Sequence, residues 1–243
     1  MVSKAKAAAT LSASANATAA PTKRKRRDGR IAEILAAARE LLETHELSQF
    51  TIADVAKAVG VSEATVFAYF GSRRELIYQV ISNWMNPVIE RLETDLRTID
   101  DTVTRLRFFV TRHLHELNDA PGLHRLIYRE LHWDDYYGSQ LHRLNQRYTR
   151  LILWVIEEGK RLGDIKPSAD AEIARDQVFG TLHHVGWRTI MNGRALDIDA
   201  AAGDITDQIF GGLRAQTMSQ AQTLDKALCR LEMITGRLAK TEK

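Results

Sequence analysis

IADVAKAVGVSEATVFAYF, residues 52–70, is the stretch that decides the fold. It predicts two short helices joined by a turn, because Gly60 tolerates the positive φ of a turn and Ala56 leaves room where the helices cross. Four valines are spaced to fill the wedge between these helices: Val55, Val59, Val61 and Val66. This layout is typical of a helix-turn-helix, whose second helix enters the major groove of DNA. Taken alone, the stretch also fits an ordinary helical hairpin.

Helix-start signals surround this unit. Two capping boxes, Thr51–Asp54 and Ser72–Glu75, predict helix starts on either side, and Ser62 can cap the second short helix. Apolar residues at helical spacing predict a preceding helix over about residues 30–45. The helix that begins after Ser72 is expected to kink or end at Pro87.

The rest of the chain repeats the helical period without internal sequence repeats. Further helices are expected to open near Asp101 and at Pro121, and then to cover about residues 139–162, 169–192 and 199–214. No segment has the alternation typical of a strand. The predicted fold class is all-α, with nine or ten helices.

The residues around the helix-turn-helix carry a family resemblance. The string RIAEILAAARELLETHELSQFTIADVAKAVGVSEATVFAYFGSRREL, residues 30–76, resembles the DNA-binding domain of the TetR family of transcriptional repressors. The matching pieces are Phe50-Thr51, Val55-Ala56, residues 58–62, Thr65-Val66-Phe67, Tyr69-Phe70, and Ser72-Arg73 with Leu76. The chain departs from the family where His45-Glu46-Leu47 replaces a usual glycine, where Phe67 replaces a usual tyrosine, and where Arg73 replaces a frequent lysine.

The resemblance implies an N-terminal three-helix DNA-binding domain followed by a helical ligand-binding and dimerisation domain. On this basis the chain divides into a disordered Ala-rich and basic arm (1–28), a helix-turn-helix domain (29–75), an effector and dimerisation domain (76–215) and a C-terminal amphipathic helix (216–243). The tail carries a heptad-like apolar stripe and is expected to pack on the body or on a partner subunit.

The resemblance also implies roles for residues of the recognition unit. Thr51, Thr65, Tyr69 and Arg73 are expected to contact phosphates. The start of the second helix would read bases through Glu63, Ala64, Thr65 and Ala68, with Ser62 and Phe67 on the same surface.

Charge is concentrated at the N-terminus. Residues 1–30 hold eight Lys and Arg against Asp28 alone, a formal charge of +7, whereas the whole chain carries +3. Residues 1–22 lack large apolar side chains and are expected to be disordered. The basic run Lys23, Arg24, Lys25, Arg26 and Arg27 could lie on DNA or be an ordinary solvated charge run.

Composition argues against several other classes. Cys229 is the chain's one cysteine, which excludes an internal disulfide and fits a reducing, cytoplasmic setting. No apolar run is long enough to cross a membrane, and no catalytic or cofactor-binding motif occurs, so neither an enzyme nor a bound cofactor is expected. A cation could be held by Glu130, His132, Asp134 and Asp135, but a polar turn explains them better, and no metal is predicted.

A ligand pocket and a dimer interface are expected in the second domain. The pocket would be lined by Trp84, Phe108, Phe109, His113, Tyr128, Trp154 and Phe179. The dimer interface would use Phe179, His183, Gly186, Trp187, Ile190, Ile205, Ile209 and Phe210, unless these residues simply cover the protomer's own core. The sequence therefore predicts a homodimeric repressor that binds a palindromic double-stranded operator and is released by a small, mostly apolar effector. The alternatives are a constitutive nucleoid-type DNA-binding protein, or a helical enzyme with a DNA-binding head.

Overall fold

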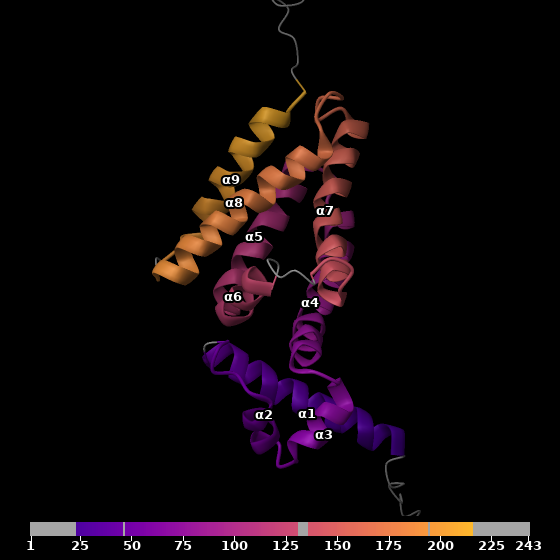
Figure 1. Ribbon diagram of the computed structural model, residues 1–243. Helices are drawn as coiled ribbons and strands as arrows, with labels where there is room; N and C mark the ends of the chain where they lie inside the picture. The colour runs from indigo at the N-terminus through magenta and orange to yellow at the C-terminus, as the bar shows by residue number, and fades with distance from the viewer. Residues whose placement is uncertain (1–22, 46, 131–135, 194, 216–243) are drawn as a thin grey trace, which may run out of the picture.

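The computed structural model describes residues 23–45, 47–130, 136–193 and 195–215, and every regular element in this part is a helix (Figure 1). The helices are α1 (Lys23–Thr44), α2 (Ile52–Ala58), α3 (Glu63–Phe70), α4 (Arg73–Thr98), α5 (Thr102–Asp119), α6 (Pro121–Glu130), α7 (Gln140–Leu162), α8 (Ala171–Asn192) and α9 (Ile198–Leu213). The predicted all-α class is confirmed. None of the described helices is both long and apolar enough to span a membrane.

The predicted capping residues begin the helices of the recognition unit. The hydroxyl of Thr51 accepts the backbone N–H of Asp54 at 3.1 Å, and the hydroxyl of Ser62 accepts that of Thr65 at 3.2 Å. Ser72 caps α4 in the same way. Gly60 has φ of +67° between α2 and α3, so the predicted turn geometry is confirmed.

The first helix starts earlier than predicted, and α4 does not end at Pro87, where the sequence predicted either a kink or an end. Residues 23–28, assigned to a disordered arm, form the first turns of α1, because Lys and Arg are good helix formers attached to a helix anchored by buried residues such as Ile34. The helix α4 continues through Pro87 to Thr98. The missing N–H of proline costs about 3 kcal/mol, and burial of α4 residues such as Ile81 and Ile89 offsets that cost.

The helices form a small N-terminal head and a larger body (Figure 1). Helices α1–α3 and the start of α4 lie at one end, and α4 runs from them into the body of α5–α9. The apolar core runs through both parts, with Val55, Val66 and Leu76 buried in the head and Phe109 and Val155 in the body. Helices α8 and α9 lie side by side along one flank of the body, and α9 packs on α5.

Three sequence interpretations fall on residues outside the described part of the chain. They are the disorder expected of residues 1–22, the polar turn expected around residues 131–135, and the C-terminal amphipathic helix expected over residues 216–243. All three stay predictions.

Candidate DNA-binding surface and effector cavity

The helix α3 presents a short, largely apolar face to solvent. Val66 and Phe70 are buried against the head, whereas Glu63, Ala64, Phe67 and Ala68 are exposed. The ring of Phe67 is 43% exposed, which is unusual for a large apolar side chain. The residues predicted to read bases thus lie on the surface, and their base contacts remain predictions.

The hydroxyls predicted to bind phosphates surround this face. Thr51 is exposed and donates to the Asp54 carboxylate at 2.6 Å, while Thr65 shares a 2.9 Å hydrogen bond with Ser62. Tyr69 is half-buried, with its ring tilted against Phe70. A phosphate would compete with Asp54 for the Thr51 proton.

Arg73 is held against the protein. Its Nη2 donates to the Leu47 carbonyl at 2.6 Å and its Nε to the Phe50 carbonyl at 3.0 Å. Its guanidinium also lies 5.4 Å from the centre of the Phe50 ring. Arg73 therefore fastens the loop between α1 and α2 to the start of α4, a role that the sequence alone did not indicate.

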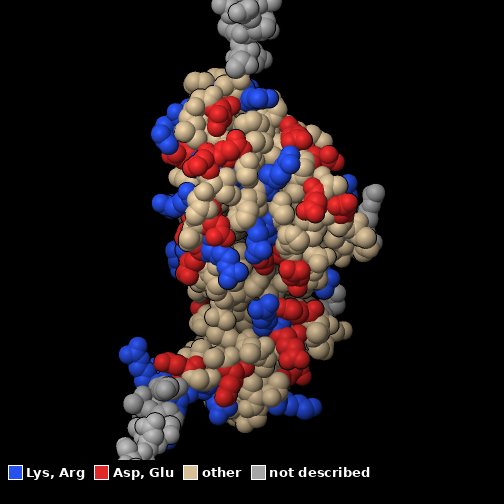
Figure 2. Space-filling model, turned by 180° about the vertical axis from the view of Figure 1, so that it is seen from behind, with Lys and Arg blue, Asp and Glu red and all other residues tan. Residues whose placement is uncertain are grey.

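The basic beginning of α1 adjoins the recognition helix. Arg24, Arg26, Arg27 and Arg30 line a groove together with Ala68 and Tyr69 of α3. Figure 2 shows Lys and Arg side chains gathered at this end of the molecule, where the described chain begins. The side chains of Lys23 and Lys25 lie outside the described part. Four arginines and α3 thus form one continuous surface that suits a polyanion.

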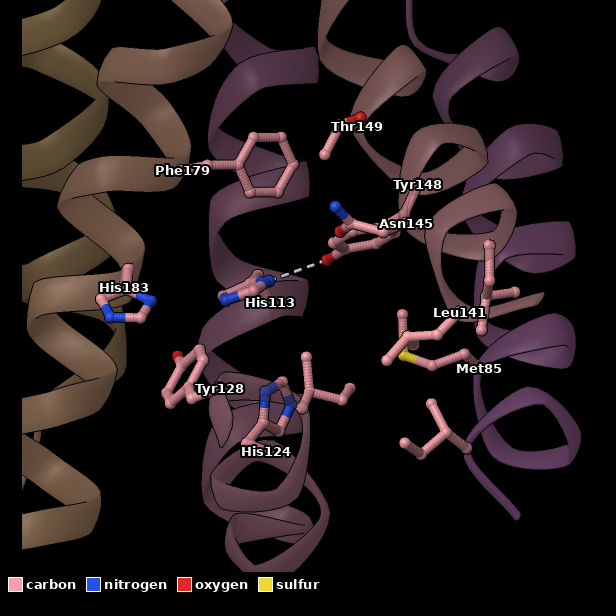
Figure 3. A pocket seen from close by; sticks show the side chains of 13 residues that line it. Met85, His113, His124, Tyr128, Leu141, Asn145, Tyr148, Thr149, Phe179 and His183 are labelled. Atoms are coloured by element: carbon pink, nitrogen blue, oxygen red, sulfur yellow. Dashed lines mark hydrogen bonds between the residues drawn. The ribbon is translucent and has the colours of Figure 1, made fainter. Parts of the chain in front are cut away.

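The body contains a cavity of about 170 Å³ walled by α4–α8 (Figure 3). It is lined by Ile81, Met85, His113, His124, Ile127, Tyr128, Leu141, Leu144, Asn145, Tyr148, Thr149, Phe179 and His183. None of these residues is Asp, Glu, Lys or Arg, so the lining carries no permanently charged side chain.

The cavity includes three of the seven predicted pocket residues: His113, Tyr128 and Phe179. Trp84 and Phe109 stand one layer behind the wall, where Trp84 packs edge-on against His124 at 5.1 Å and Phe109 lies 5.2 Å from the Tyr148 ring.

Two predicted residues lie away from the cavity. Trp154 lies under the guanidinium of Arg105, 5.0 Å from its ring centre, and Phe108 packs at the edge of the core. From α7 the prediction named Trp154 and missed Leu141, Asn145 and Tyr148, which follow the spacing of one helical face.

Two histidines and two tyrosines of the cavity wall are uncharged near neutral pH. Burial lowers the pKa of His113 to about 4, and burial together with His113 holds the pKa of His124 well below its usual value. Burial also raises the pKa values of the Tyr128 and Tyr148 hydroxyls. The Nδ1 atom of His113 and the hydroxyl of Tyr148 are 2.8 Å apart and share a hydrogen bond (Figure 3).

Several residues predicted for a dimer interface point into the protomer. A Cβ on Gly186 would lie 2.4 Å from the Tyr128 hydroxyl, so this glycine allows α8 to pack closely on α6. Ile205 is buried, and Phe179 and His183 line the cavity. These residues therefore cover the protomer's own core in this structure, and their part in a dimer interface stays a prediction.

The remaining predicted interface residues lie at or near the surface. Trp187 is 48% exposed, and Ile190, Ile209 and Phe210 are half-buried. Ile173, at 59% exposure, lies on the same side of α8 as Trp187, fourteen residues earlier in the helix.

Two family models match the chain. The model for bacterial regulatory proteins of the tetR family matches residues 34–80, and the model for the C-terminal region of YsiA-like proteins matches residues 81–212. The first covers most of the DNA-binding head, and the second covers more than half of the chain.

Individual relatives are more distant. The chain is 23% identical over 190 residues to the fatty acid metabolism regulator protein of Bacillus subtilis, an alignment that covers 78% of this chain and 98% of that protein. It is 30% identical over 142 residues to the nucleoid occlusion factor SlmA of Sodalis glossinidius, covering 57% of this chain and 70% of that one.

A solved structure shares the fold. The transcriptional regulator FadR from Bacillus subtilis, solved in complex with stearoyl-CoA, matches with a TM-score of 0.64 at 22% identity, covering 75% of this chain and 99% of that chain.

Proposed function

Because this chain belongs to the TetR family of bacterial regulatory proteins, we propose that it is a ligand-responsive repressor, released from its operator by a small, mostly apolar molecule. The observation that carries the proposal is a cavity in the body that has no Asp, Glu, Lys or Arg in its lining, and two of its wall helices, α4 and α6, reach the DNA-binding head. Such a protein needs no catalytic group, and its proposed location is the cytoplasm, where the DNA is.

DNA recognition is proposed to use α3 and the start of α1 together. The exposed face of α3 would enter the major groove, while Arg24, Arg27 and Arg30 would neutralise phosphates beside it. Ala64, Phe67 and Ala68 offer apolar contacts that suit thymine methyl groups, and Glu63 can accept from cytosine N4. The domain boundary is accordingly proposed at the start of α4.

Helix α6 offers a direct mechanical link between cavity and head. His124 and Tyr128 line the cavity, whereas Gly122, in the first turn of the same helix, lies against the backbone of α1. A Cβ on Gly122 would lie 2.6 Å from the Cα of Glu43, so no side chain fits between the two helices there. Displacement of α6 by a ligand would therefore push directly on α1.

Helix α4 offers a second link. Ile81 and Met85 line the cavity, and Arg73 at the start of the same helix holds the loop between α1 and α2. A shift of α4 would thus move the loop that precedes α2 and α3. Both links are rigid helices, which transmit small displacements well.

Cavity size supports release by expansion. Pockets for small molecules usually enclose roughly 300–1,000 Å³, whereas this cavity holds about 170 Å³. A larger ligand that is taken up fully between the helices would have to separate the walls, and it would therefore prefer the arrangement in which they are apart. That preference is what a ligand needs in order to shift the protein away from its DNA-bound state.

Dimerisation is proposed to use the outward faces of α8 and α9. Ile173 and Trp187 are exposed on α8, and Gly180 between them has open space around its Cβ position. A two-fold dimer would place two α3 helices about one DNA turn, roughly 34 Å, apart and would require a palindromic operator.

A fatty acyl compound is the proposed effector class. Support comes from the solved FadR of Bacillus subtilis, which holds stearoyl-CoA, and from the apolar cavity wall of this chain. The competing function is constitutive, weakly specific DNA binding. The similarity to nucleoid occlusion factors supports this alternative.

Footprinting on genomic fragments, followed by titration with octanoyl-CoA and stearoyl-CoA, separates these functions. A discrete palindromic footprint that an acyl compound removes supports the repressor. Salt-sensitive coating of any DNA, unchanged by acyl compounds, refutes it.

A further inference from the structure

His124 carries an unsatisfied polar atom at the cavity. The side chain lies in the cavity wall and is 5% exposed, yet its Nε2 atom has no hydrogen-bond partner among the described residues. Buried polar atoms are nearly always hydrogen-bonded, so an exception in a cavity wall calls for a partner from outside the chain.

Aromatic neighbours hold the His124 ring in place. The Trp84 ring meets it edge-on at 5.1 Å, and the His113 ring meets it edge-on at 5.6 Å. The ring therefore cannot turn its nitrogen toward solvent without displacing Trp84 or His113. Its orientation is set before any ligand arrives, as a specific anchor requires.

His113 offers a second polar atom. Its Nδ1 atom is paired with the Tyr148 hydroxyl at 2.8 Å, and its other ring nitrogen points away from Tyr148 (Figure 3). A phenol is the stronger donor and an imidazole the stronger acceptor, so the Tyr148 proton belongs in this bond and Nε2 of His113 carries the imidazole N–H. The cavity thus holds a fixed donor on His113 beside the unpartnered His124.

We propose that His124 and His113 form a polar anchor that selects effectors bearing an uncharged oxygen, such as an ester or thioester carbonyl, within an otherwise apolar body. The inference rests on the proposed effector role of the cavity and narrows the chemistry of its ligand. The imidazole N–H groups donate to that oxygen, while Met85, Leu141 and Phe179 surround the hydrocarbon.

The anchor discriminates against carboxylates. A carboxylate in this cavity would have no Lys or Arg among the lining residues to pair with. The lining has three histidines, and burial keeps the two imidazoles of the proposed anchor, His113 and His124, neutral near pH 7. Burying an unpaired charge is far more costly than burying a hydrogen-bonded carbonyl.

The test compares four probes whose hydrocarbon chains are of similar length: methyl octanoate, octanoyl-CoA, octanoate and nonane. Binding to the DNA-free protein is measured by isothermal titration calorimetry, and operator release by fluorescence anisotropy. Two variants of nearly equal size separate hydrogen bonding from volume: His124→Gln retains a hydrogen-bonding side chain, and His124→Met does not. His115→Met, on α5 but outside the cavity wall, is the control for a histidine substitution as such.

The proposal predicts that methyl octanoate binds about tenfold more tightly than nonane and about a hundredfold more tightly than octanoate. His124→Met should remove the advantage over nonane, whereas His124→Gln and His115→Met should keep most of it. If octanoate or nonane binds as tightly as the ester, or if Gln and Met at position 124 behave alike, the anchor is refuted.

The two readouts separate the anchor from the proposed function. Ester binding with the expected variant pattern but without operator release supports the anchor and refutes release by this ligand class. If the probes release the operator equally well from the wild-type protein and from the His124 variants, the anchor is refuted, but the proposed repressor function is not. Failure of all four probes to bind the wild-type protein counts against both.

Discussion

Substitution of Gly122 by alanine tests the link between cavity and head most directly. The added methyl carbon would lie 2.6 Å from the Cα and 2.8 Å from the carbonyl oxygen of Glu43, both backbone atoms. Ordinary contacts of this kind start near 3.4 Å, so α6 and α1 must separate by several tenths of an ångström. Overpacking of this kind costs about 1–3 kcal/mol of unfolding free energy.

The same strain should weaken DNA binding. If the released state already separates α6 from α1, the methyl group is strained only in the DNA-bound state, and the equilibrium shifts by up to the same 1–3 kcal/mol, or about 5–150-fold in operator affinity. Gly122→Ala should therefore mimic the effector in part. Operator affinity is measured by anisotropy without ligand, and unfolding free energy by urea denaturation.

Leu123→Ala is the matched control. Leu123 is fully buried on the same helix, and its truncation should cost about 2–5 kcal/mol by creating a cavity, without forcing α6 from α1. If both variants lose stability and both keep wild-type operator affinity, the contact at Gly122 does not carry the signal. If Gly122→Ala and Leu123→Ala both lose operator affinity, the loss is explained by reduced stability and not by the contact between α6 and α1.

Three further predictions concern the interface, the buried histidines and the basic end of α1. Trp187 is exposed, so Trp187→Lys should give folded monomers that bind the operator weakly. Gly186 packs against Tyr128 within the protomer, so Gly186→Ala should stay dimeric but lose about 1–3 kcal/mol of unfolding free energy. Sedimentation velocity measures the oligomeric state, and urea unfolding measures the stability. The pKa of His113 is about 4 in the folded protein, against 6.5 for an unperturbed histidine. As the pH falls through this window the unfolded state takes up a proton before the folded state does. The free energy of unfolding should therefore drop by about 2 kcal/mol between pH 7 and pH 5. A His113→Gln variant with an equally steep pH profile would contradict this. Replacing Arg24 and Arg27 by glutamine should weaken operator binding and reduce its dependence on salt concentration, with the preference for the operator sequence retained. If the salt dependence of binding is unchanged, these two arginines do not contact the DNA.

Local features of the head were predictable from sequence because neighbouring residues determine them. Thr51, Ser62 and Ser72 cap their helices through bonds to backbone three residues later, and Gly60 makes its turn from its own φ freedom. Arg73 shows the limit of this reasoning. Its partners, the carbonyls of Leu47 and Phe50, are more than twenty residues away, and no periodicity points to them.

The cavity and the interface were harder to predict because α8 is apolar on two faces. Phe179, His183 and Gly186 make one stripe at helical spacing, which lies against the cavity and α6. Ile173 and Trp187 lie on another, which is exposed. Both stripes satisfy the same spacing rule, so only the packing of α8 against its neighbours decides which one faces inward.

The geometry of α6 limits which ligands can act. The helix has ten residues, with His124 and Tyr128 at the cavity and Gly122 against α1, so any widening of the cavity at α6 reaches the head. A ligand small enough for the existing 170 Å³ would leave α6 in place and bind both states equally, and such a ligand releases no DNA however tightly it binds. Shifting the protein from 1:99 to 99:1 requires about 5.5 kcal/mol of preference for the released state. That preference must come from ligand volume that the resting cavity cannot hold, so release should increase with acyl chain length even where binding does not.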